Sequence, residues 1–229
     1  VTANTTAVRV LIDHHLHPPV DGYAVQFSDT HACSTSYIVY QLLEALAGTD
    51  AIDQAMAESL YVGIMTDTGN FSFSSLTSDL FRAVAVLIDK GVNVPYVNSS
   101  VYNNFSEGRM RLLGYMLNDK MVTDYEFGVA YVSLTEEEMR RFDFIQGDSE
   151  GFVNYPLSIR GIRMSAMFIQ TKHSIRVSLR SRGEVDVNVF ARRYFDGGGH
   201  RNAAGGKSYV PMNETLENFG KYLREYFGA

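Results

Sequence analysis

Three consecutive residues, Asp13, His14 and His15, carry side chains that bind metal ions and transfer protons. They come directly after the apolar run 8–12, which predicts a buried strand. The carboxyl end of such a strand is where α/β proteins place ligands. Neutral imidazole is a metal ligand, and a neighbouring carboxylate can ligate as well or orient the ring. The triplet therefore predicts a metal site, with a surface turn before the following prolines as the alternative.

A second carboxylate, Asp67, stands where the apolar stretch 60–65 breaks before Gly69. We expect Asp67 to meet His14 in space as a second metal ligand. Aspartate at such a position also forms Asx turns and helix caps, which is the alternative interpretation.

Glycine supplies five of the ten residues in the segment 197–206. Glycine lets a backbone approach a ligand closely and turn its N–H groups toward an anion. A loop with Gly198, Gly199, His200 and Arg201 therefore predicts an anion site, with a flexible linker as the alternative. The segment is not a P-loop, because no Gly-Lys-Ser/Thr follows, and it lacks the spacing of a dinucleotide fingerprint.

Arg180 and Ser181 end a further predicted strand, and a strand end can direct a guanidinium or a hydroxyl into a cleft. The planar guanidinium makes two parallel hydrogen bonds to phosphate. The alternative is a solvated hairpin end.

These residues must be positioned by two different kinds of element. In the first half, one strand is followed by three helices with capping residues at their starts, which suggests an α/β unit with a parallel sheet. The predicted helices are residues 37–47 behind Ser34 or Thr35, a helix through residue 64 behind Asp50, and a helix through residue 88 behind Thr77.

In the second half, the spacing of apolar residues changes from the period of a helix to the alternation of a strand. Ser106 is expected to cap a spacer helix, and the tail 214–227 also reads as a helix. The predicted strands are 127–134, 164–170 and 175–180. We therefore predict an α/β protein with three parts: a parallel-sheet domain (1–104), a linker helix (105–120) and a smaller mixed α+β domain (121–229).

The composition of the 229 residues is that of a globular protein, with 45% apolar and 20% charged residues and a net charge of −6. These values exclude disorder, collagen and a coiled coil. The single cysteine, Cys33, excludes an internal disulfide framework. No membrane span or signal peptide is visible, so we expect a cytoplasmic protein.

Charge is divided unevenly along the chain. The first 100 residues hold 3 basic and 10 acidic side chains, whereas residues 140–201 hold 11 basic and 6 acidic ones. We interpret this as an acidic half that holds cations and an arginine-rich half that holds phosphates. The low overall charge argues against duplex DNA as a partner.

Taken together, these motifs resemble the DHH phosphoesterase family, named for the Asp-His-His triplet. Residues 12–16 are similar to the family's third block and residues 63–71 to its fourth. Residues 177–181 and 197–206 look like the strand and glycine motifs of the DHH-associated C-terminal domain. The layout is most similar to the branch of bacterial nanoRNases that are also 3′-phosphoadenosine 5′-phosphate phosphatases.

The resemblance implies hydrolysis of short oligoribonucleotides and 3′-phosphoadenosine 5′-phosphate by water activated between two Mn²⁺ ions, or Mg²⁺ ions, in a cleft between the domains. It implies that His14 and Asp67 bind metal and that Asp13, His14 and His15 are catalytic. The substrate-binding residues it implies are Arg180, Ser181, Gly198, Gly199, His200 and Arg201.

One departure from the family concerns the metal ligands. The family's first block is an Asp-x-Asp segment with a nearby His, and its second is a further Asp. Both lie upstream of a strand like this one, but residues 1–9 hold no Asp, Glu or His. We therefore expect a chain with only this sequence to bind the metal pair poorly and to be inactive or nearly so.

Three alternatives stay open on the same motifs. The first is a cyclic dinucleotide phosphodiesterase, and the second is a pyrophosphatase or exopolyphosphatase on the same scaffold. The third is a nucleotide-binding module without catalysis. The oligomeric state, including a homodimer, is also left open by the sequence.

Overall fold

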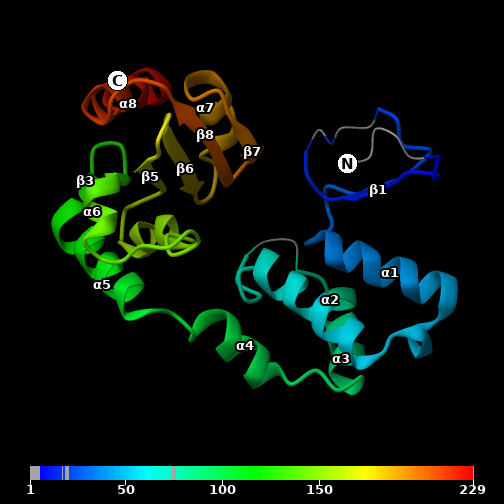
Figure 1. The fold of residues 1–229 in the computed structure, drawn as a ribbon. Coiled ribbons are helices and arrows are strands. Elements are labelled where there is room, and N and C mark those ends of the chain that lie inside the picture. The colour runs from blue at the N-terminus through cyan, green and yellow to red at the C-terminus, as the bar shows by residue number, and fades with distance from the viewer. Residues whose placement is uncertain (1–5, 17, 19–20, 74–75, 229) are drawn as a thin grey trace. The chain divides into compact units, whose positions relative to one another are not determined.

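The computed structural model describes residues 6–16, 18, 21–73 and 76–228, which form two compact units, Val1–Asn104 and Phe105–Ala229 (Figure 1). Each unit is described by itself. The first unit contains β1 (Val10–Asp13), β2 (Val25–Ser28), α1 (Thr35–Ala47), a 3₁₀ turn (Thr49–Ala51), α2 (Gln54–Asp67), α3 (Ser78–Asp89) and α4 (Val94–Tyr102).

The strands of the first unit form a two-stranded parallel sheet, in which Val10 lies opposite Val25 and Asp13 opposite Ser28. The parallel arrangement agrees with the predicted α/β class. The prediction of a buried first strand is wrong, because no residue of either strand is buried and Val10 is 47% exposed. The core of this unit forms among its helices instead, and β2 and α4 were not predicted from the sequence.

Helix caps in the first unit follow local sequence signals. The Ser34 side chain accepts a hydrogen bond from the Tyr37 backbone, and Thr77 caps α3 in the same way, as predicted. The prediction that Asp50 caps α2 is wrong, since the chain first makes a 3₁₀ turn that contains Asp50. Asp53 is the cap, and its carboxylate accepts from the Met56 N–H at 2.8 Å.

The second unit is built on one mixed sheet with the strand order β3-β4-β5-β6-β8-β7. The β4–β5 pair is parallel and the other pairs are antiparallel. The strands are β3 (Val122–Asp124), β4 (Val129–Leu134), β5 (Met164–Gln170), β6 (Ile175–Ser181), β7 (Gly198–His200) and β8 (Ala203–Ser208). The helical elements are α5 (Glu107–Tyr115), a π-helical turn (Met116–Lys120), α6 (Glu136–Arg140), a 3₁₀ helix (Phe152–Ser158), α7 (Val187–Tyr194) and α8 (Met212–Phe227).

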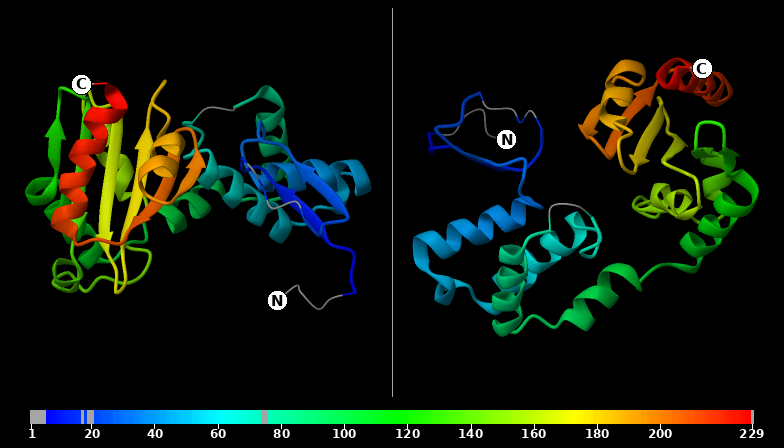
Figure 2. Two further views of the ribbon diagram at one scale, coloured as in Figure 1. Left: turned by 90° about the horizontal axis from the view of Figure 1, so that it is seen from above. Right: turned by 180° about the vertical axis from the view of Figure 1, so that it is seen from behind.

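Helices pack on both faces of this sheet, so the predicted mixed domain has three layers. On one face Phe168 packs with Phe219 of α8, and Figure 2 shows α8 (red) running across the strands. On the other face Met167 packs with Leu112 and Met116. Because both faces are covered, every residue of β5 except the last is buried.

The segment expected to be a linker helix begins at the predicted cap, Ser106, whose side chain accepts from the Arg109 N–H at 3.0 Å. Leu112 and Met116 are fully buried in the core of the second unit. Residues 105–120 therefore pack as part of that unit. Within the described ranges, no helix has the length and apolar character that crossing a membrane requires.

Candidate functional site

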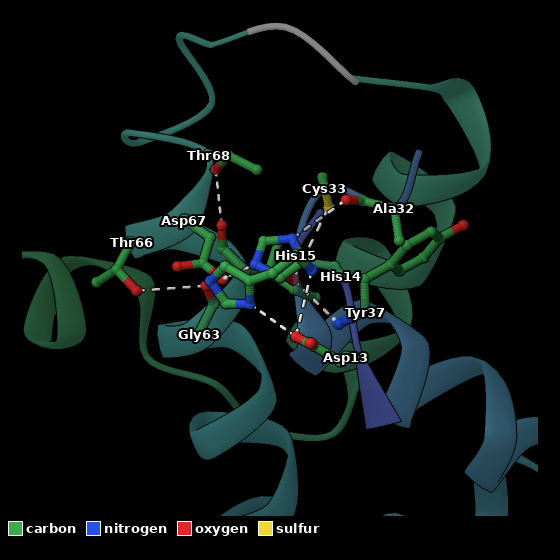
Figure 3. A network of polar contacts seen from close by, with 12 residues as sticks. Asp13, His14, His15, Ala32, Cys33, Tyr37, Gly63, Thr66, Asp67 and Thr68 are labelled. Atoms are coloured by element: carbon green, nitrogen blue, oxygen red, sulfur yellow. Dashed lines mark hydrogen bonds and ion pairs between the residues drawn. The ribbon is translucent and has the colours of Figure 1, made fainter. Parts of the chain in front are cut away.

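The His14 ring lies just beyond β1, where the chain leaves the two-stranded sheet (Figure 3). Its Nδ1 atom lies 3.4 Å from the carbonyl oxygen of Ala32. A carbonyl can only accept, so this contact places the ring hydrogen on Nδ1 and makes Nε2 the nitrogen that carries the ring's lone pair. Metal-binding histidines are commonly oriented by such a backbone acceptor.

Asp67 is the last residue of α2, and its Oδ2 atom lies 3.7 Å from His14 Nε2 (Figure 3). A close approach between α1 and α2 supports this placement. A Cβ atom added at Gly63 of α2 would lie 2.0 Å from the Ser36 hydroxyl of α1. Glycine at position 63 therefore allows the helix that carries Asp67 to lie against α1.

The separation of these two side chains, 3.7 Å, is close to that of two ligands of one cation. Two atoms that each lie about 2.1 Å from an ion are roughly 3–3.6 Å apart at ordinary coordination angles. The His14 side chain is 13% exposed and that of Asp67 is 44% exposed, so the pair is accessible from the carboxylate side. A nitrogen and a hard oxygen donor suit Mn²⁺ or Mg²⁺ better than a metal that prefers thiolate.

Asp13 is engaged by its neighbour His15. Its Oδ1 atom accepts hydrogen bonds from His15 Nδ1 at 2.6 Å and from the His15 backbone N–H at 3.2 Å. Burial acts to raise the pKa of the Asp13 carboxyl, but these hydrogen bonds outweigh it, so the pKa lies below its ordinary value. Asp13 thus stays ionised and orients the His15 ring.

The turn after α2 is in an unusual backbone conformation that was not predicted. Gly69, Asn70 and Phe71 have φ angles of 56°, 55° and 59°. Each non-glycine residue in this region costs about 1–2 kcal/mol, and such strain gathers at functional sites. The buried Thr68 hydroxyl stabilises the turn by donating to the Ile64 carbonyl at 2.7 Å and accepting from the Phe71 N–H at 3.1 Å.

In the second unit, three predicted residues share one face of the sheet. Arg180 of β6 pairs with Ala203 of β8, which in turn pairs with His200 of β7. Directly paired residues point to the same face, so Arg180, Ala203 and His200 form what we call the Arg180 row. Gly198 lies on the same face, two residues from His200 along β7.

Arg180 has a half-buried guanidinium. Burial lowers its pKa, partly offset by the charge of Glu150. Its Nη1 atom donates to the Leu179 carbonyl oxygen at 2.9 Å, and among the described residues no carboxylate lies within ion-pair distance of it. A planar cation in this state is suited to an anion supplied from outside.

Ser181 and Arg201 are engaged within the protein. Ser181 is buried, and its hydroxyl donates to the Val185 carbonyl oxygen at 2.6 Å. The Arg201 guanidinium forms an ion pair with Glu184. Both of these predicted substrate-binding side chains are therefore engaged by other groups of the second unit.

The segment 197–206, expected to be a loop, forms the β7–β8 hairpin. A Cβ atom at Gly197 would lie 2.0 Å from the Gly205 carbonyl oxygen, and one at Gly206 would lie 2.4 Å from the Phe195 carbonyl oxygen. The Gly199 N–H donates to the Asn188 side chain at 3.0 Å rather than standing open in an anion-binding loop. Close backbone packing accounts for these glycines.

Comparisons with known proteins match the chain along most of its length. The profile of the DHHA1 domain matches residues 125–229. The chain is 32% identical over 203 residues to the bifunctional oligoribonuclease and PAP phosphatase NrnA of Bacillus subtilis, covering 86% of this chain and 62% of that protein. It is 28% identical over 227 residues to the cyclic-di-AMP phosphodiesterase GdpP of the same organism, covering 95% of this chain and 32% of that protein.

A crystal structure of an exopolyphosphatase-related protein from Bacteroides fragilis has the same fold. The sequences are 38% identical and the TM-score is 0.92, over 97% of this chain and 65% of that one. The chain thus spans a little under two thirds of the lengths of the B. subtilis NrnA and of this structural neighbour.

Proposed function

Because the chain belongs to the DHH phosphoesterase family, we propose that it is a metal-dependent phosphoesterase acting on short oligoribonucleotides and on 3′-phosphoadenosine 5′-phosphate. The observation that carries the proposal is the pair His14 and Asp67, whose facing atoms lie 3.7 Å apart. The similarity to an oligoribonuclease and PAP phosphatase, over 86% of the chain, supports the substrate class.

His14 and Asp67 are the residues of the first unit that would hold a divalent cation, which we propose to be Mn²⁺. Such a cation polarises a phosphoryl oxygen and lowers the pKa of water. His14 is set for this role by the Ala32 carbonyl, which fixes the hydrogen on the other ring nitrogen. Asp13 holds the His15 ring so that it can contact a phosphate oxygen or hold a proton at Nε2.

In the second unit, Arg180 and His200 would bind the substrate. The Arg180 guanidinium can donate two hydrogen bonds to one phosphate group. His200 shares the Arg180 row and adds a ring nitrogen on the same face of the sheet. Gly198 lies on the same face, and the Arg192 guanidinium is 3.5 Å from the position that its Cβ atom would occupy, so a further cation borders the proposed phosphate site.

A cyclic dinucleotide is the second candidate substrate, favoured by the similarity to a cyclic-di-AMP phosphodiesterase. The two candidates share the proposed metal chemistry and differ in the substrate phosphates. Only substrate preference separates them.

The test is a substrate panel with the purified protein and Mn²⁺. It comprises di- to pentaribonucleotides, 3′-phosphoadenosine 5′-phosphate, cyclic-di-AMP and pyrophosphate, with nucleotide binding measured in parallel. In a preparation that also carries the family's first two metal-ligand blocks, we expect release of mononucleotides from the short oligomers and of phosphate from 3′-phosphoadenosine 5′-phosphate, both abolished in D67N. With this sequence alone, we expect little or no turnover. Preferential cleavage of cyclic-di-AMP would favour the second candidate, and binding without turnover by any preparation would support a non-catalytic module.

A further inference from the structure

A second pair of basic side chains lies on the same face of the sheet as Arg180. Arg176 of β6 is directly opposite Lys207 of β8, and both are exposed. Directly opposed residues in an antiparallel pair point the same way, and like charges in that arrangement are destabilising. An anion between the two side chains would remove that repulsion.

Neither cation is neutralised by a carboxylate within the described part of the chain. Arg176 Nη2 donates to the Ser149 hydroxyl at 2.9 Å, and no ion pair or hydrogen bond engages the Lys207 ammonium there. Other arginines of this unit do have such partners, as the pairs Arg193–Glu225 and Arg201–Glu184 show.

The support under Arg176 is a buried and fixed turn. Ser149 is only 3% exposed. Arg109 stabilises the turn that contains Ser149 by donating hydrogen bonds to the carbonyl oxygens of Asp148 and Glu150. The Arg109 guanidinium is itself buried and lies 4.0 Å from the ring centroid of Phe105. Arg176 is therefore positioned by a rigid part of the structure.

The strand register arranges these residues in three rows across the sheet. The Arg180 row comes first, and the next row contains Ser178, Gly205 and Gly198, which we call the glycine row. Arg176 and Lys207 form the third, which we call the Arg176 row. At roughly 3.3 Å per residue, the two cationic rows are about 13 Å apart along the strands. Between them lies the glycine row, where the Arg192 guanidinium borders Gly198, 3.5 Å from the position that a Cβ atom would occupy.

We propose that the Arg176 row is a second anion subsite, which binds a phosphate group farther along the same substrate than the one held at Arg180. The inference rests on the proposed function and deepens it. The substrate class is a short single-stranded chain with several phosphates, lying across the glycine row. Positive side chains that follow the backbone are a general means of binding single strands. A mononucleotide reaches only one cationic row and gains nothing from the other.

The test is a binding comparison with two probes, adenosine 5′-monophosphate and a phosphorothioate-linked triadenylate that resists hydrolysis. Dissociation constants are measured by calorimetry for the wild-type protein, K207Q, R176Q and R180Q. K221Q is the matched control, because it removes one lysine charge from α8, on the opposite face of the sheet.

We expect K207Q and R176Q to weaken triadenylate binding about tenfold and to change mononucleotide binding less than twofold. The salt dependence of triadenylate binding should also fall by about one counterion for each cation removed. R180Q should weaken the binding of both probes, and K221Q should leave the binding of both unchanged. The melting temperature of K207Q should stay the same or rise, since a like-charge contact is removed.

Two other results have distinct meanings. Wild-type protein that binds both probes, with K207Q and R176Q showing unchanged or equally reduced affinity for each, overturns the second subsite while the proposed function stands. Wild-type protein that binds neither probe overturns the proposed function and the subsite with it.

Discussion

The two sheets of the molecule differ in how much of them is buried. No residue of β1 or β2 is buried, whereas β5 is buried along all but its last residue. The second unit forms its hydrophobic core around its sheet, and the first forms its core among α1–α4. Within the described residues, polar side chains of the first unit follow the end of β1, whereas the second unit keeps six strands in register around a hydrophobic core.

The chemistry of the two units differs in the same way. In the first, the candidate residues stand at the ends of β1 and α2 and already contact one another. In the second, cations lie along β6 and β8, without carboxylate partners among the described residues at Arg176, Arg180 and Lys207. The first arrangement suits a cation and the second suits anions.

The largest expected effect tests the difference in burial. Replacing Phe168, which is fully buried, by alanine should lower the free energy of unfolding by about 3–5 kcal/mol, because it leaves a cavity in the core. F27A is the matched change in the first sheet and should cost less than about 1 kcal/mol, since Phe27 is 39% exposed. Denaturant titrations of both variants measure this, and equal losses would contradict the contrast.

The second prediction tests the assignment of cation and anion chemistry. H14A should reduce Mn²⁺ affinity at least about 100-fold, because it removes a ligand atom that the backbone orients. R180Q should leave Mn²⁺ affinity within about twofold. Titration of Mn²⁺ followed by electron paramagnetic resonance gives both values, and wild-type affinity in H14A would remove that residue from the metal site.

The third prediction concerns acid stability, which Glu138 of the second unit should dominate. Burial acts to raise the pKa of Glu138, but hydrogen bonds from Lys120, Thr135 and Tyr115 lower it from 4.5 to about 2. A depressed carboxyl pKa stabilises the fold fully above pH 4.5, and that stabilisation is lost as the pH falls toward 2.

We therefore expect the unfolding free energy of the wild type to fall by about 2–3 kcal/mol across that interval from this group. E138Q should be less stable at pH 7 and should show a shallower acid slope. The measurement is denaturant unfolding at several pH values from 2 to 7. An unchanged slope in E138Q would show that another carboxylate governs the acid transition.

The smallest expected effect concerns the helix caps, whose contribution to stability should be the same in both units. T77A and S106A each remove a hydrogen bond from a helix cap and should each cost about 1 kcal/mol. S99A, on the exposed side of α4, is the control and should stay within about 0.5 kcal/mol of the wild type. A clearly larger loss for one cap would show that the unit around it depends on that helix end.

Local signals account for much of what the sequence predicted. Ser34, Thr77 and Ser106 cap helices because each side chain reaches an N–H group only three residues away. The strands 164–170 and 175–180 are present because a four-residue turn joins them and their alternation fits the register. The meeting of His14 with Asp67 was also expected from the motifs, and the structure places them together.

Features that depend on distant parts of the chain were not predicted. The sequence alone predicts a loop for the glycine run. The close approach of Gly197 to the Gly205 carbonyl oxygen, which explains why glycine is needed there, depends on the pairing of β7 with β8. The pairing of Arg176 with Lys207 depends on the register between β6 and β8. The sequence around Asp50 and that around Asp53 are both compatible with a helix cap. Asp53 is the cap because a 3₁₀ turn that contains Asp50 precedes α2.

The parallel pairing of β4 with β5 has a consequence for the kinetics of folding. β5 and β6 are neighbours in the chain and can form their hairpin early, at the turn 171–174. β4 reaches β5 only after the crossover 135–163, which contains α6 and the 3₁₀ helix, has closed into a loop. Closing a long loop before its contacts form slows folding. We therefore expect the docking of β4 to be a slow step in the folding of the second unit.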